Sequence, residues 1–264
     1  MQLIDQLGRL INIPKRPVRI ISLCPSETET LAALVTPERI IGCTRYCKYP
    51  ETLVSNLKHV GGTKQLDIDL IVKLEPDLLI AVREENDKAQ IEQLANMFPV
   101  LILDPIDHAS TLQSIQMIGE AVGETHRADR LIKDIEKAVS SLHQASGQRV
   151  LYLIWRKPYM AVGGGTFIGT MLESLGLTNA GTALSGRYPV LDDEAIKRAD
   201  PELIFASSEP FPFQDKHVSE LQKRFPDCAI HLVDGEAFGW HGVRTLQLSS
   251  VLNTLVQRIA TPSL

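Results

Sequence analysis

The chain has 264 residues, of which 44% are hydrophobic and 22% charged, and its formal net charge is -5 at pH 7. These values allow one large domain or two lobes, and the acidic balance argues against a general nucleic-acid-binding protein. No stretch approaches the roughly 18 uninterrupted apolar residues of a membrane helix. Asp5 and Arg9 interrupt the first segment, where an export signal needs an unbroken apolar run, so no signal peptide is predicted.

Short β-rich runs alternate with helix-length segments along the whole chain. The runs are apolar on both faces, which is typical of mostly parallel sheets covered by helices. The sequence therefore predicts an α/β fold. The expected strands are residues 19–23, 39–44, 77–82, 100–104, 149–155, 202–207 and 229–234.

The first run leads into "CPSETETLAAL" (24–34), which reads as a loop followed by a helix. Ser26 with Glu29 three residues later matches a capping box, so Ser26 is the expected N-cap. Cys24 as a nucleophile would need an activating base, and its neighbours are carboxylates, which would raise the pKa of a thiol. We expect this segment to shape a ligand cradle instead of a catalytic site.

Residues 124–144 carry apolar side chains on one stripe at helical spacing. A helix of about 20 residues would be roughly 30 Å long. Because it lies between two α/β halves, we expect it to connect them.

An internal repeat supports two halves. Residues 66–81 read "LDIDLIVKLEPDLLIA" and residues 191–206 read "LDDEAIKRADPELIFA", an offset of 191 − 66 = 125 positions. Phe-Pro, a strand and an Asp recur in 98–104 and 225–234. We therefore predict two similar Rossmann-like lobes. The expected boundaries are 1–122 for the N-terminal lobe, 123–146 for a linking helix and 147–264 for the C-terminal lobe.

Strong catalytic signatures are absent: there is no Walker A sequence, no Gly-x-Ser-x-Gly elbow and no His-Glu-x-x-His. "VGGGTFIG" (162–169) fits a tight turn with a Thr166 helix cap better than an anion cradle. The cysteines are too few for a disulfide framework, and the spacing of Cys43 and Cys47 is neither a redox nor a zinc spacing. We expect reduced, unligated thiols and no metal site. The four cysteines are Cys24, Cys43, Cys47 and Cys228, and the seven dispersed histidines are His59, His108, His126, His143, His217, His231 and His241.

Aromatic and arginine side chains gather on the loops between the expected elements. At the carboxyl ends of strands, such side chains suit a flat, partly polar ligand. For any single one of them, surface packing remains an equal alternative. The set comprises Arg45, Tyr46, Tyr49, Trp155, Arg156, Tyr159, Arg187, Tyr188, Phe238, Trp240, His241 and Arg244.

Four blocks of the sequence resemble the substrate-binding proteins of ABC importers for cobalamin, iron-siderophores and haem. The blocks are residues 7–34, 39–50, 60–81 and 188–207. Tyr46, Tyr49–Pro50 and the neighbourhood of Trp155 look most like cobalamin-binding receptors. The resemblance implies two lobes joined by a single long helix, with a ligand cleft between them and little hinge motion. It also implies a monomeric binding protein without enzymatic activity or cofactor, which captures a small molecule and delivers it to a permease dimer.

The loop side chains and the resemblance together single out particular residues, of which Trp240 and His241 are local substitutions relative to the family. The expected ligand-binding residues are Tyr46, Trp155, Tyr188, Trp240, His241 and Arg244. Asp69 and Glu194 match the acidic residues that dock onto arginine pockets of the permease, and the repeat places them 125 positions apart. The plain alternative is that both are first-turn helix acids, which the helix dipole favours.

Two departures keep alternatives open. Val82 and Val190 stand where cobalamin receptors would carry cleft tryptophans, so another corrinoid or a ferric siderophore remains a candidate ligand. The missing export signal predicts a cytoplasmic chain if the N-terminus is native, and a periplasmic or cell-surface one if a signal was removed. An intracellular corrinoid or metal-ligand carrier, or an α/β enzyme using the same cleft, are the alternative functions.

Overall fold

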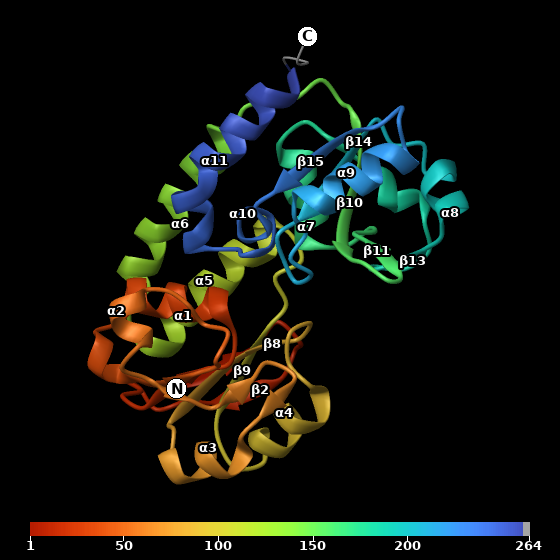
Figure 1. Ribbon diagram of the computed structural model, residues 1–264. Helices are drawn as coiled ribbons and strands as arrows, with labels where there is room; N and C mark the ends of the chain where they lie inside the picture. Colours follow the sequence, from red (N-terminus) through yellow and green to blue (C-terminus); the bar gives the residue numbers. More distant parts are fainter. Residues whose placement is uncertain (261–264) are drawn as a thin grey trace. The chain divides into compact units, whose positions relative to one another are not determined.

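The computed structural model describes residues 1–260, which form two compact units (Figure 1). Unit 1 comprises Met1–Glu136 together with the short segment His241–Arg244. Unit 2 comprises Lys137–Trp240 and the described chain from Thr245 onward. The chain passes from unit 1 into unit 2 within one helix, α6 (Thr125–Ser140).

Unit 1 is built on a five-stranded parallel sheet with the strand order β5-β4-β3-β8-β9. Four of its strands are the expected apolar runs, and β5 is a two-residue edge strand that the sequence pattern does not reveal. The strands of this sheet are β3 (Ile20–Ser22), β4 (Ile40–Cys43), β5 (Lys58–His59), β8 (Leu78–Val82) and β9 (Val100–Leu103). Two small hairpins accompany it: β1 (Gln2–Ile4) with β2 (Leu10–Asn12), and β6 (Gly61–Gly62) with β7 (Gln65–Leu66).

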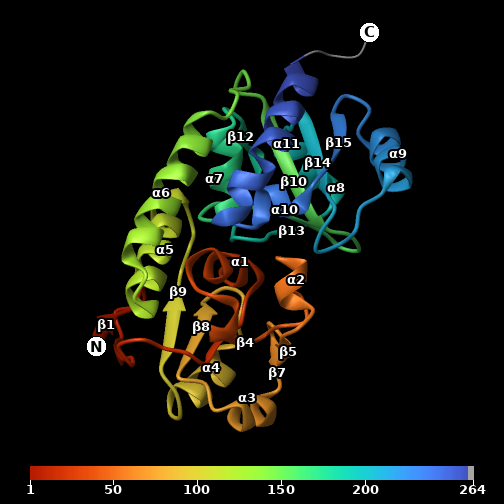
Figure 2. The same cartoon turned by 90° about the vertical axis from the view of Figure 1, so that its left-hand side faces the viewer.

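Helices pack on both faces of this sheet (Figure 2). Ile71 of α3 and Leu94 of α4 share a buried cluster with Ile21, Leu79 and Ile102, which point to one face. Helix α1 contacts β3, β4 and α5. The helices are α1 (Pro25–Leu34), α2 (Glu51–Val54), α3 (Ile68–Leu74), α4 (Lys88–Ala95), α5 (His108–Val122), α6 and the 3₁₀ turn η1 (Pro37–Arg39).

Helix α1 begins earlier than the capping-box pattern predicts. Its N-cap is Cys24 and Pro25 occupies the first helical position, so the assignment of Ser26 as N-cap is wrong. Proline favours that position because its fixed φ suits a helix and its missing N–H would have no partner there. Ser26 lies inside the first turn, where its carbonyl accepts a hydrogen bond from Thr30 Oγ1 at 3.0 Å.

Helix α6 ends at Ser140, before the ends of both the apolar stripe (144) and the linking segment (146) proposed from the sequence. Its apolar stripe is buried at Ala128, Leu131 and Ile135. Beyond the helix, Leu142 joins the hydrophobic core of unit 2. Leu142 is therefore buried, as the periodicity predicts, but on non-helical chain.

Unit 2 is built on a six-stranded mixed sheet with the order β13-β11-β10-β14-β15, and β12 also pairs with β10. The pairs of β10 with β12 and β14, and of β14 with β15, are parallel. Strands β11 and β13 form an antiparallel edge. The strands are β10 (Arg149–Trp155), β11 (Tyr159–Ala161), β12 (Thr178–Asn179), β13 (Val190–Leu191), β14 (Leu203–Ser207) and β15 (Ala229–Val233).

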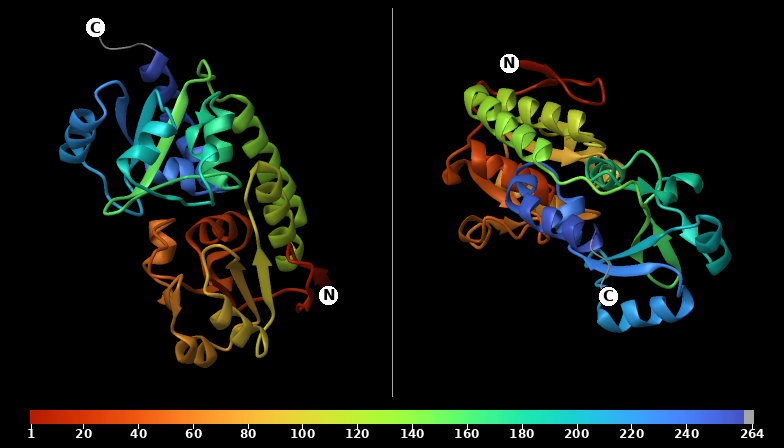
Figure 3. Two further views of the ribbon diagram at one scale, coloured as in Figure 1. Left: turned by 90° about the vertical axis from the view of Figure 1, so that its right-hand side faces the viewer. Right: turned by 90° about the horizontal axis from the view of Figure 1, so that it is seen from above.

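The sheet of unit 2 is also covered on both faces, as alternation along its strands requires (Figure 3). Tyr152 and Phe205 point to the face covered by α7, α10 and α11. Leu153 and Ile204 point to the face covered by α8 and α9. The helices are α7 (Phe167–Ser174), α8 (Asp193–Arg198), α9 (Asp215–Arg224), α10 (Gly235–Gly239), α11 (Val243–Ala260) and the 3₁₀ turn η2 (Ala180–Ala183).

The sequence repeat corresponds to a repeat of local geometry in the two units. Asp67 caps α3 and Asp192 caps α8 through the same side-chain acceptor position. Glu75 and Asp200, each before a proline, both adopt a left-handed backbone with φ of 44° and 47°. An arginine Nε donates to the carbonyl of each, Arg19 at 3.0 Å and Arg149 at 2.7 Å.

Candidate functional site

The expected ligand residues of unit 1 follow the carboxyl ends of its parallel strands. Helix α1 follows β3, and the loop 44–50 follows β4. In parallel α/β sheets this edge is where ligands bind, because the helix N-termini and the loops meet there. The candidate site of unit 1 therefore consists of this loop and the side chains of α1.

Two tyrosines of the loop 44–50 are accessible. Tyr46 is 52% exposed and Tyr49 37% exposed. The guanidinium of Arg45 lies 5.5 Å from the ring centroid of Tyr46. Both side chains pack on Gly62, where an added Cβ would lie 2.9 Å from Arg45 Nη2 and 3.0 Å from Tyr46 Cε2. Gly62 thus leaves room for this aromatic–cation pair.

His241 and Arg244 lie in unit 1, against α1. The Arg244 guanidinium makes an ion pair with Glu29 and lies 3.8 Å from the ring centroid of Tyr49. His241 Nε2 is 3.5 Å from Glu27 Oε1. Both residues are buried, 9% and 5% exposed, so they are engaged by the protein itself.

Burial shifts the pKa values of Glu27 and His241 in opposite directions. Burial raises the pKa of Glu27 to about 8 and lowers the pKa of His241 to about 4. At pH 7 Glu27 is therefore mostly a neutral carboxyl beside a neutral imidazole. Glu27 and Glu29 lie in the segment that was expected to shape a ligand cradle, but neither was named as a ligand-binding residue. The available signal was a pair of acids in a helix that follows a buried strand.

In unit 2, Trp155 forms an aromatic wall at the carboxyl end of β10. Its side chain is 41% exposed, and the ring of Phe211 meets it edge-on at 5.9 Å between centroids. Phe211 in turn packs on Phe213 at 4.9 Å and on His217 at 5.3 Å. The sequence analysis missed Phe211, for which the signal was the aromatic run "PFPF" (210–213) after the strand β14.

Trp240 and Tyr188 are the other expected ligand residues of unit 2. Trp240 is half-buried, and its Nε1 donates a 2.6 Å hydrogen bond to Glu209 Oε1. Tyr188 is half-buried against the core formed by Tyr152 and Phe205. Unit 2 thus holds Trp155, Tyr188 and Trp240, whereas Tyr46, His241 and Arg244 belong to unit 1.

The two valines noted in the sequence lie in different environments. Val82 ends β8 and is 3% exposed, so it belongs to the core of unit 1. Val190 opens the edge strand β13 and is 60% exposed. A surface valine at this position offers a ligand far less stacking area than a tryptophan would.

Asp69 and Glu194 occupy the first turns of α3 and α8, two residues after the capping aspartates. Both side chains are exposed. Glu194 is 3.2 Å from Lys197 Nζ, and its side chain keeps 70% exposure. Their placement satisfies both the docking prediction and the plain first-turn alternative.

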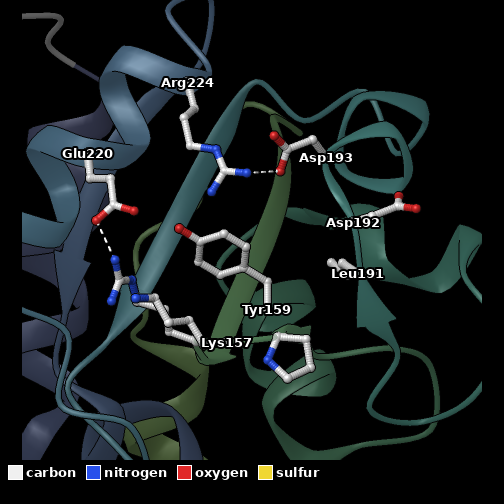
Figure 4. Close-up of a pocket in the computed structure, with 9 residues that line it drawn as sticks. Lys157, Tyr159, Leu191, Asp192, Asp193, Glu220 and Arg224 are labelled. Carbon is white, nitrogen blue, oxygen red and sulfur yellow. Dashed lines mark hydrogen bonds and ion pairs between the residues drawn. The ribbon is translucent and has the colours of Figure 1, made fainter.

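A pocket of about 380 Å³ lies in unit 2 (Figure 4). It is lined by the β10–β11 turn, the end of β13, the start of α8 and two residues of α9. Two ion pairs flank its tyrosine: Arg156 Nη2 is 2.5 Å from Glu220 Oε2, and Arg224 pairs with Asp193. The Arg224 guanidinium lies 5.5 Å from the ring centroid of Tyr159. The lining charges are balanced, so the pocket favours neither an anion nor a cation.

There is neither a cluster of metal-binding side chains nor a membrane-spanning helix in the described chain, residues 1–260. Among residues 1–260, no group of three or more His, Cys, Asp or Glu side chains is placed to hold a metal ion. Within the same residues, no helix combines the length and apolar character that a bilayer crossing requires.

Thr166 caps α7, because its Oγ1 accepts a 3.1 Å hydrogen bond from Gly169 N. This confirms the predicted turn and helix cap.

Two α/β units with aromatic side chains at the carboxyl ends of their strands define a ligand-binding protein of the periplasmic type. The family model described as periplasmic binding protein matches residues 20–227, and the chain belongs to that family. The α/β fold and the family expected from the sequence are thereby confirmed.

Known relatives agree with this assignment. A substrate-binding lipoprotein of an ABC transporter from Bacillus subtilis is 29% identical over 212 residues, 76% of this chain and 67% of the relative. A vitamin B12-binding protein from Pectobacterium carotovorum is 26% identical over 252 residues, 90% of each chain. The structure of a periplasmic haem-binding protein from Vibrio cholerae is similar in fold, with a TM-score of 0.77 and 21% identity, covering 90% of this chain and 98% of that one.

Proposed function

We propose that this chain captures a corrinoid or a related metal-chelate ligand and delivers it to the permease of an ABC importer. The observation that carries the proposal is the set of accessible aromatic side chains at the carboxyl strand ends, Tyr46 and Trp155 above all. Similarity to a vitamin B12-binding protein over 90% of both chains supports the corrinoid class. A structural neighbour named for haem makes haem a competing ligand, and a ferric siderophore is the other competitor that the sequence resemblance implies.

The six predicted ligand residues divide into two roles. Tyr46 and Trp155 offer exposed rings for stacking on a flat ligand, and the half-buried Tyr188 and Trp240 offer a smaller accessible area. His241 and Arg244 act through their neighbours, because their partners in unit 1 are Glu27, Glu29 and Tyr49. In this proposal Arg244 holds Tyr49 in place for the ligand, and His241 packs beside Glu27 of α1.

The proposal includes a setting for the protein. It works outside the cytoplasmic membrane, as its family does, binds as a monomer and converts nothing chemically, without a resident cofactor or metal. An intracellular carrier would instead function without a permease. An enzyme would convert its ligand into a product. Sedimentation of the pure protein and product analysis after incubation with the ligand test the monomer and the absence of turnover.

Ligand titration of single variants tests the binding role. Cyanocobalamin, a ferric siderophore and haem are titrated in turn, followed by absorbance and tryptophan fluorescence. We expect one of them to bind and Trp155→Ala to weaken it about tenfold, since a lost aromatic contact of ~1.4 kcal/mol corresponds to that factor.

Tyr46→Ala should have a similar effect, because this tyrosine is more exposed than Trp155. Tyr159→Phe is the matched control, because this aromatic residue is buried beside the balanced pocket of Figure 4. Equal affinities of the wild type and both alanine variants would remove the stacking role. Failure of all three ligands to bind would remove the proposed function.

A further inference from the structure

Two neighbouring buried thiols lie in unit 1, one at the end of β4 and one on the loop that carries Tyr46. Cys43 ends β4, and Cys47 follows after a turn closed by a 3.1 Å hydrogen bond from Cys47 N to the carbonyl of Thr44. The two side chains share a buried cluster with Val54 and shift the pKa of each other. Both cysteines are free thiols in this structure.

The surroundings of Cys47 favour its thiolate. Its Sγ lies 3.1 Å from Thr28 Oγ1 and 3.3 Å from Thr44 Oγ1. The thiol of Cys43 and these hydroxyls lower the pKa of Cys47 to about 7, with burial acting against them. Thr28 Oγ1 also donates to the carbonyl of Cys24 at 2.9 Å, so its proton must turn toward Sγ when Cys47 ionises.

Cys43 has the opposite role in the pair. Its hydrogen bond to Cys47 and its burial raise the pKa of Cys43 above its ordinary value. Cys43 therefore keeps its proton and donates it, while Cys47 accepts. The pair consists of one nucleophilic sulfur and one protonated thiol in contact with it, which is the arrangement of an attacking and a resolving cysteine.

A third buried thiol, Cys24, is held apart from this chemistry. Burial raises the pKa of Cys24, and its Sγ donates to Asn86 Oδ1 at 3.3 Å. Asn86 is itself fixed, because its Nδ2 donates to the carbonyls of Leu23 and Thr63, both at 3.1 Å. Cys24 is thus engaged by a rigid amide and serves as an internal comparison.

We propose that Cys43 and Cys47 are a dithiol modification site, which a small hydroperoxide converts into an intramolecular disulfide. The Cys47 thiolate attacks one peroxide oxygen, so that an S–O bond forms, the O–O bond breaks and hydroxide leaves. The Cys43 sulfur then loses its proton, attacks the Cys47 sulfur and expels the hydroxyl as water. Overall, two thiols and one hydrogen peroxide give one disulfide and two waters.

The burial of the pair defines its oxidant and its consequence. Cys47 is only 5% exposed and Cys43 is fully buried, so the oxidant must be small. A disulfide needs an S–S distance of about 2.05 Å. The short turn between Cys43 and Cys47 must therefore let the two sulfurs approach each other. The closed ring would contain Tyr46, so oxidation would restrict the loop that carries this aromatic side chain.

Peptide mapping of the folded, full-length protein tests the proposal. The protein is treated with hydrogen peroxide, blocked with a maleimide in denaturant, and digested with trypsin, which cleaves after Arg39, Arg45 and Lys48. We expect residues 40–45 and 46–48 to appear as one linked species, two hydrogens lighter than the separate peptides, with two of the four thiols lost.

Serine variants identify the sulfurs involved. Cys24→Ser and Cys228→Ser should leave the linked species unchanged, whereas Cys43→Ser and Cys47→Ser should abolish it. Four outcomes would overturn the proposal: no thiol loss in the wild type, a link between 46–48 and the Cys24 peptide (20–39), stable over-oxidation of Cys47 without a bridge, or only intermolecular dimers through Cys228. If Cys43→Ser or Cys47→Ser fails to fold, the wild type, Cys24→Ser and Cys228→Ser still test the proposal.

Discussion

Glu27 and His241 are two buried titratable groups in contact, and their pKa values move in opposite directions. Folding raises the pKa of Glu27 from 4.5 to about 8, so the folded state keeps a proton that the unfolded state releases. Its contribution to stability is therefore complete below pH 4.5 and is lost as the pH rises to about 8. His241, lowered from 6.5 to about 4, loses stability as the pH falls through that interval.

The sum of these effects gives a measurable pH profile. Between pH 4.5 and 6.5 the two slopes oppose each other, and above pH 6.5 only that of Glu27 remains. We expect the free energy of unfolding of the wild type to fall, relative to Glu27→Gln, by about 1.4 kcal/mol per pH unit, or about 2 kcal/mol from pH 6.5 to 8. Urea unfolding of both proteins across this range measures the difference, and parallel curves would contradict the raised pKa.

Helices α5 and α6 pack closely through a glycine. A Cβ added at Gly119 would lie 2.4 Å from the Cβ of Ala128, which is far inside van der Waals contact. Gly119→Ala should therefore lower the free energy of unfolding by about 1–2 kcal/mol, although alanine is the better helix former. The measurement is the denaturation midpoint at constant slope.

Two further variants separate crowding from helix propensity. Gly239→Ala is the matched control, since the nearest atom to its added Cβ is a side-chain carbon at 3.9 Å. Ala128→Gly in the Gly119→Ala background removes the crowded methyl and should restore part of the loss. A stabilised Gly119→Ala protein would show that the helices separate without cost.

At the scale of the whole molecule, the repeat and the apolar runs predicted the two α/β units well, because both depend on local sequence. The paired backbones at Glu75 and Asp200 follow from the same acid-Pro-acid motif. Features that depend on tertiary contact were missed. The antiparallel edge strands β11 and β13 are too short to show a period, and nothing local places His241–Arg244 in unit 1. The same limit hid Phe211 and the partners of Glu27 and Glu29, because these contacts arise only on folding.

Asp69 and Glu194 give the prediction that concerns both units together. Because they occupy equivalent first-turn positions, a permease dimer with two equivalent basic pockets could bind one with each. Replacing either by Arg should weaken docking at least tenfold, and the double variant should abolish transport while ligand affinity stays unchanged. Transport into vesicles and direct ligand titration are measured on the same preparations.

Glu92→Arg is the matched control. Glu92 is an exposed acid on α4 and has a lysine one turn away, as Glu194 does. Unimpaired transport by Asp69→Arg/Glu194→Arg would leave both acids with only their helix-dipole role.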